Sequence, residues 1–224
     1  MSPDPENPEN TVVQLCAQGM RAEGEGRDAE ARSLFTRAWE SAGDDYEACV
    51  AAHYPARCQS TPEDALHWNL ECLARADRVG DERVRPFYAS LHGSIGGALL
   101  ELGEPGRARG HFEAAAGRLA DLPPGQYAQW LRLCVARGLR ATGTADPGAA
   151  AGDPLPALME RLCARVDLDS LALLLPAYLG DLGGPKDAER LTTALRMLHA
   201  ERRLPGPEQT ALGRAIAART AAAG

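Results

Sequence analysis

The sequence predicts an all-α fold, and two features support this class. Alanine and leucine are abundant, whereas the chain of 224 residues contains only three Phe, three Trp and five Tyr. This composition suits close-packed helices better than sheets, in which aromatic and β-branched residues are enriched. The second feature is an internal repeat in which small and aromatic residues recur at helical spacing. We therefore expect antiparallel helix hairpins stacked one after another.

Length and charge limit which kinds of protein the sequence can encode. A hydrophobic content of 45% in a chain of this length is enough to bury a sizeable core. The net charge of -7 and the pI near 5.3 argue against a nucleic-acid-binding surface, which normally carries a basic patch. Lys186 is the only lysine beside 23 arginines, a usage that points to a high-GC, actinobacterial genome.

The sequence contains no segment that predicts a membrane span or an export signal. Residues 1–10, MSPDPENPEN, are acidic and Pro-rich, and they lack the basic start and the apolar core of a secretion signal. We expect them to form a disordered lead-in. The longest apolar run, residues 171–179, is shorter than the about 20 residues that cross a bilayer. These features predict a cytoplasmic protein without a membrane partner.

The repeat is defined by three copies of one pattern. The copies are Ala31-x3-Phe35-x2-Ala38, Ala65-x3-Asn69-x2-Cys72 and Ala108-x3-Phe112-x2-Ala115. Two further positions recur upstream of the first alanine of each copy. Twelve residues before it stand Gly19, His53 and Gly96, and five residues before it stand Gly26, Ser60 and Gly103. The implied repeats of 34 residues are 12–45, 46–79 and 89–122, with an insertion at 80–88 and a fourth repeat starting near residue 124.

The pattern resembles the tetratricopeptide repeat family over roughly residues 12–142. That family has a helix-turn-helix unit of 34 residues, with a small residue in the first helix and A-x3-F in the second. The resemblance implies a right-handed superhelix with a concave groove. The sequence departs from the family at His53 and Asn69, which replace a small and an aromatic residue, and no repeat has the family's tryptophan.

Turn and capping residues place the helices. Thr61-Pro62-Glu63-Asp64 provides an N-cap, a proline for the first turn and acidic residues at the positive helix end, and Glu104-Pro105 is similar. We expect a kink or an early end at Pro55, which lies inside a predicted helix. The predicted helices are 11–24, 27–42, 44–58, 62–79, 82–101, 105–120, 124–142, 155–166, 168–181, 185–203 and 207–222.

The last part of the chain has no clear repeat register. Residues 143–154 are rich in Gly, Ala and Pro and predict a flexible connector. The segment 155–224 then forms a helical bundle or a cap. Because residues 162–179 are unusually apolar, they fold back as such a cap or form a homodimer contact.

No catalytic or cofactor signature is present. The sequence lacks HExxH, GxSxG, GxxxxGK[ST] and a strand-linked GxGxxG, so it gives no reason to predict an enzyme, a cofactor or a metal. Cys49, His53 and Cys58 come closest to a ligand cluster, but further ligands would be needed, and we interpret them as packing residues. The six cysteines have no CxxC spacing and are expected to be free thiols.

The resemblance assigns candidate binding residues. In that family the first helix of each repeat lines the concave groove, and its register selects Glu23, Tyr54, Arg57, Ser90 and Gly97, to which we add His92 as a residue that would help to close a pocket. Arg57 suits a carboxylate, Tyr54 suits stacking, and Ser90 and Gly97 leave room for a ligand backbone. Alternatively, these side chains only meet water or the C-terminal helices.

The predicted function is non-catalytic binding of a protein or peptide in this groove. Two alternatives remain open. One is a regulatory module that senses a small molecule or short peptide, and the other is a biosynthetic enzyme built on a repeat scaffold. Asn69 takes a position that is normally aromatic and buried, so we expect it to form a hydrogen bond with the next repeat, near Phe87, Tyr88 or His92.

Overall fold

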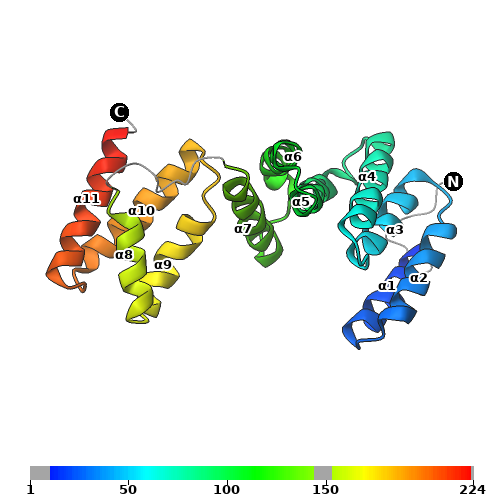
Figure 1. Ribbon diagram of the computed structural model, residues 1–224, viewed down its shortest axis with the longest axis horizontal. Coiled ribbons are helices and arrows are strands. Elements are labelled where there is room, and N and C mark those ends of the chain that lie inside the picture. The colour runs from blue at the N-terminus through cyan, green and yellow to red at the C-terminus, as the bar shows by residue number, and fades with distance from the viewer. Residues whose placement is uncertain (1–10, 144–152, 223–224) are drawn as a thin grey trace. The chain divides into compact units, whose positions relative to one another are not determined.

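The computed structural model describes residues 11–143 and 153–222, except for the side chains of Arg57 and Ala222. The predicted lead-in and most of the predicted connector therefore lie outside the described residues. Within the described ranges the secondary structure is helical, without strands. None of the helices in these ranges is both long and apolar enough to cross a membrane. The chain divides into two compact units, the first ending at Leu131 and the second beginning at Arg132 (Figure 1).

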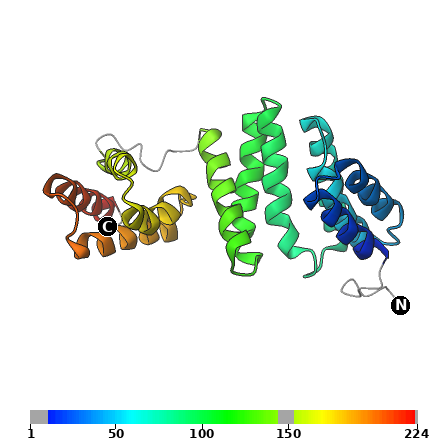
Figure 2. The same ribbon diagram turned by 90° about the horizontal axis from the view of Figure 1, so that it is seen from below.

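The first unit consists of three helix hairpins followed by the start of a seventh helix (Figure 2). Within each hairpin the two helices pack along each other, and α2 also contacts α3 while α4 contacts α5. The helices are α1 (Thr11–Gly24), α2 (Asp28–Glu40), α3 (Asp45–Arg57), α4 (Pro62–Val79), α5 (Arg85–Glu101), α6 (Pro105–Arg118) and α7 (Gln126–Ala141), with a 3-10 turn at Leu119–Asp121. Each predicted helix is present, and the ends differ from the predicted ones by a few residues.

Small residues allow the first and third hairpins to close in the same way. A Cβ placed on Gly19 would lie 2.2 Å from the ring of Phe35, and one on Gly96 would lie 2.9 Å from the ring of Phe112. The rings therefore occupy space that any side chain on the facing helix would need. Ala31 and Ala108 are both fully buried at equivalent positions. The sequence pattern thus corresponds to a real close approach of two helices.

The turns of these two hairpins are also equivalent. Gly26 and Gly103 have φ values of +74° and +76°, in the left-handed region that glycine adopts without strain. The residue after each glycine donates its backbone N–H to a carbonyl five residues earlier, from Arg27 to Ala22 at 2.8 Å and from Glu104 to Leu99 at 2.9 Å. This is the Schellman pattern that ends a helix. One turn geometry therefore recurs wherever the repeat has its glycine.

The second hairpin departs from this pattern. Asn69 is buried, but its side chain donates to the backbone carbonyl of Ala65 in its own helix at 2.8 Å. The predicted bond to the next repeat is therefore wrong, because a carbonyl one turn earlier in the helix satisfies the amide. Pro55 lies inside α3, which ends two residues later, and its carbonyl accepts from Cys58 N and Gln59 Nε2.

Buried cysteines fill the core of the second hairpin. The sulfurs of Cys49 and Cys72 are 3.6 Å apart, and the Cys72 thiol donates to the Cys49 carbonyl. The contact with the Cys49 thiol, and then burial, raise the pKa of Cys72 far above its ordinary range. Burial also raises the pKa of Cys16 to about 12. The described residues contain no group of three or more His, Cys, Asp or Glu that could hold a metal ion.

The second unit contains the C-terminal part of α7 and, after it, a four-helix bundle. The helices of the bundle are α8 (Leu155–Ala164), α9 (Leu168–Leu179), α10 (Pro185–Glu201) and α11 (Gly206–Ala222). Contacts run from α8 to α9, α9 to α10, α10 to α11 and from α11 back to α8, so the bundle closes on itself. Leu171 and Leu174 from the apolar stretch lie in its core together with Leu158 and Leu195. The bundle core therefore accounts for much of that stretch.

Arginines join the ends of these helices to buried carboxylates. Asp153 binds Arg219 at 2.6 Å, and Glu208 binds Arg165. Asp187 binds Arg132 of α7, which also donates to the carbonyl of Gly180 at 2.8 Å. A buried carboxylate is tolerated only when it is paired in this way. The C-terminal part of α7 is thereby attached to the loop between α9 and α10.

Candidate functional site

The six predicted binding residues all lie on the first helix of a hairpin. Glu23 is in α1, Tyr54 and Arg57 are in α3, and Ser90, His92 and Gly97 are in α5. The side chain of Arg57 is outside the part of the chain that the structure describes. The other five differ in what their side chains contact.

Three of the five take part in internal contacts. Tyr54 is half-buried and stacks on Phe35 of the preceding hairpin, with 5.0 Å between the ring centroids. Ser90 is 7% exposed, and its hydroxyl donates to the carbonyl of Phe87 at 2.9 Å. Glu23 accepts a weak bond from the thiol of Cys58 at 4.0 Å. These contacts connect or stabilise helices, so none of the three side chains depends on a ligand for its position.

Gly97 lies beside open space. A Cβ placed on it would meet nothing within 4 Å, unlike its neighbour Gly96, which faces Phe112. Adjacent glycines of α5 therefore have different roles. Gly96 admits the ring of the second helix, while the backbone at Gly97 remains accessible to a ligand chain.

His92 belongs to an aromatic cluster that the sequence did not predict. Its Nδ1 lies 3.0 Å from Nδ1 of His111 in α6, so one imidazole donates to the other. Tyr88 stacks over His92 at 6.4 Å between centroids, and its hydroxyl donates to Asp77 Oδ1 in α4 at 2.9 Å. The guanidinium of Arg118 lies 5.2 Å from the centre of the Tyr88 ring. We call Asp77, Tyr88, His92, His111 and Arg118 the histidine cluster.

Burial and nearby charges favour the neutral form of the two histidines and of the tyrosine in the histidine cluster. Burial, and then the charge of His111, lower the pKa of His92, with a further lowering by Arg118 that Asp77 opposes. Burial and the charge of Arg107 lower the pKa of His111. Burial and the bond to Asp77 raise the pKa of Tyr88 to about 12. The cluster therefore offers neutral hydrogen-bonding rings.

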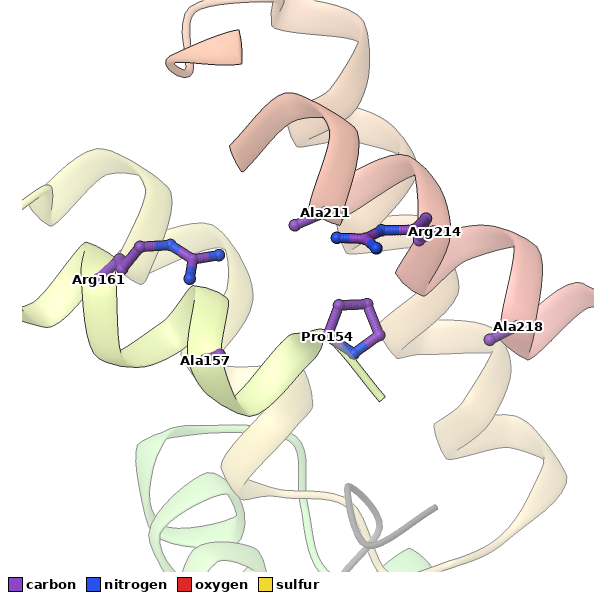
Figure 3. A pocket seen from close by; sticks show the side chains of 6 residues that line it. All are labelled: Pro154, Ala157, Arg161, Ala211, Arg214 and Ala218. Atoms are coloured by element: carbon purple, nitrogen blue, oxygen red, sulfur yellow. The ribbon is translucent and has the colours of Figure 1, made fainter. Parts of the chain in front are cut away.

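The second unit contains a cavity that sequence reasoning missed. It lies between α8 and α11, has a volume of about 320 Å³, and is lined by Pro154, Ala157, Arg161, Ala211, Arg214 and Ala218. Figure 3 shows Arg161 and Arg214 extending from the two helices toward one another. These arginines are far apart in the sequence, and no motif marks them. Only the closure of the bundle brings them together.

A second cavity, in the first unit, is lined in part by an arginine that is already paired. It has a volume of about 500 Å³ and includes Trp39, Asp45 and Arg75 in its lining. Arg75 lies over the Trp39 ring at 5.1 Å, and it pairs with Asp45 at 3.0 Å and with Glu71 at 2.8 Å. Asp45 and Arg75 are therefore paired without a ligand.

Comparison with known proteins gives no relative from which a function can be transferred: no family model matches the sequence, and no curated protein or solved structure matches the chain.

Proposed function

We propose that the first unit is a tetratricopeptide-like array of right-handed superhelical sense, in which the first helices of the hairpins bind an extended peptide segment of a partner protein. The observation that carries the proposal is the repeated hairpin, with its glycine–phenylalanine contact and its glycine turn in two of three repeats. A hairpin of this kind has two apolar faces and can bury both only by stacking on neighbours. Stacking leaves the first helices side by side as a binding surface.

The surface of α5 supports a peptide as the ligand. Gly97 leaves open space beside its backbone on α5, whereas Nδ1 of His92 is already engaged with His111 and only the second ring nitrogen remains for a ligand. The backbone of a ligand can approach a helix closely where a side chain is missing. We place the binding surface along α1, α3 and α5, around Tyr54, His92 and Gly97.

Gly97→Leu tests this proposal, with Gly110→Leu as the matched control. Both glycines lie within helices, and a Cβ on either would meet nothing within 4 Å, so neither change should impair folding. Gly97 is on the first helix of its hairpin and Gly110 on the second. Peptides selected from a display library on the wild-type chain should bind Gly97→Leu about tenfold more weakly or worse, since every 1.4 kcal/mol corresponds to a factor of ten.

Gly110→Leu should bind the same peptides with wild-type affinity. If no peptide is enriched, or if both variants bind equally, the first helices are not the binding surface. Selective binding of small molecules instead of peptides would favour the regulatory sensing function, which the same residues also allow. Affinity capture with wild type and Arg57→Ala adds an independent comparison in a native extract.

A further inference from the structure

The cavity between α8 and α11 has the composition of a small anion site. Its walls are mainly alanine and proline, and its two charged side chains are both arginines. Figure 3 shows that Arg161 comes from α8 and Arg214 from α11, and that their guanidinium groups point toward one another. Short alanine side chains leave the space between them open.

These two arginines are poorly neutralised compared with their neighbours. Arg161 has one ion pair, with Glu208 at 3.9 Å, and that carboxylate is bound more closely by Arg165. Among the described residues, Arg214 has no hydrogen bond or ion pair. By contrast, Arg219 on the same helix is bound to Asp153 through two hydrogen bonds. The bundle therefore leaves two positive charges turned toward one cavity.

We propose that this cavity binds a small dianion, held between the guanidinium groups of Arg161 and Arg214. Each guanidinium presents a planar set of N–H donors that matches the oxygens of a phosphate or a carboxylate. Two of them on facing walls suit a ligand with two negative charges. A volume of about 320 Å³ is at the lower end for small-molecule sites, which favours a phosphate monoester or a short dicarboxylate.

Titration calorimetry of the full chain with inorganic phosphate and, separately, with succinate tests the charge requirement. We expect at least one of the two probes to bind with a Kd of about 1 mM or lower, so binding should be detected at probe concentrations up to about 10 mM, a tenfold excess over that Kd. Arg161→Gln and Arg214→Gln should each weaken that binding about tenfold or more. Arg32→Gln, which removes the same charge from an exposed position on α2, should leave it unchanged. The preferred probe then distinguishes phosphate from carboxylate ligands.

Ala218→Leu tests the cavity itself without a change in charge. Ala218 lines the cavity and Ala217 does not, although both are exposed on α11. Leucine at 218 should weaken binding about tenfold, whereas Ala217→Leu should behave as wild type. The proposal is overturned if neither probe binds, if the arginine variants bind like wild type, if Arg32→Gln loses binding equally, or if the two leucine variants do not differ.

Discussion

Gly19 faces the ring of Phe35 so closely that the contact determines how α1 and α2 pack. We predict that Gly19→Ala destabilises the protein by up to about 2 kcal/mol. Overpacking a core costs about 1–3 kcal/mol, and the higher helix propensity of alanine returns about 1 kcal/mol of this. Urea unfolding followed by circular dichroism measures the difference. Gly97→Ala, where the added methyl meets open space, should be neutral or stabilising; equal stability of the two variants would contradict the packing argument.

The histidine pair makes stability depend on pH in a defined direction. The folded protein lowers the pKa of His92 and of His111 from the ordinary value of 6.5. As the pH falls through 6.5, the unfolded chain therefore takes up protons more readily than the folded chain, and the contribution of the pair to stability is lost. We predict a free energy of unfolding that decreases between pH 7.5 and the lowered pKa values.

His111→Gln should reduce this dependence on pH, because it removes one titrating ring and the repulsion that it causes. The control is His67→Gln, which changes an exposed histidine of α4 and should retain the wild-type slope. Urea unfolding at a series of pH values measures both variants. A wild-type slope in His111→Gln would mean that other groups control this pH range.

At the scale of single residues, the sequence predicted the small side chains but not their polar neighbours. The spacing of Gly19, Gly96, Ala31 and Ala108 follows from a period that is visible along the chain. Two polar contacts do not follow from that period: the bond of Asn69 to Ala65 and the pair of His92 with His111. Each depends on the side-chain rotamers of both partners.

At the scale of elements, one turn recurs beyond the predicted repeats. The link between α8 and α9 has the same backbone bond as the first and third hairpins, from Asp167 N to the carbonyl of Leu162 at 3.0 Å. The position that glycine occupies in those hairpins is taken here by Val166, with φ of +56°. A β-branched residue is strained in this region. The sequence predicted both helices but not this turn, because the turn lacks the expected glycine.

We predict that Val166→Gly stabilises the protein by about 1 kcal/mol. The left-handed conformation costs a non-glycine residue about 1–2 kcal/mol, which the variant regains. The backbone entropy that glycine adds to the unfolded chain offsets part of this gain. Val166 is 66% exposed, so little packing is lost. Thermal and urea unfolding measure the change. Ala164→Gly, two residues earlier within α8, should instead lower stability by about 1 kcal/mol. A loss of stability in both variants would show that Val166 is not strained.

At the scale of the whole molecule, the two units were predictable to different degrees. The first follows from a repeat in which two of the three hairpins make the same glycine–phenylalanine contact, so local spacing is informative about packing. The second is a closed bundle whose four helices contact one another in a ring. Its buried carboxylates pair with arginines that lie far away in the sequence, as Asp153 does with Arg219. Such pairs have no sequence period.

The sequence alone determined the helical class, the positions of the helices and the small residues that let two hairpins close, because these depend on periodicity and turn chemistry within a few tens of residues. The tertiary structure decided the partners of the polar side chains, the closure of the bundle and the placement of Arg161 and Arg214 around one cavity. These features require segments distant in the sequence to come together, and their side-chain directions are set only when the core between them is packed.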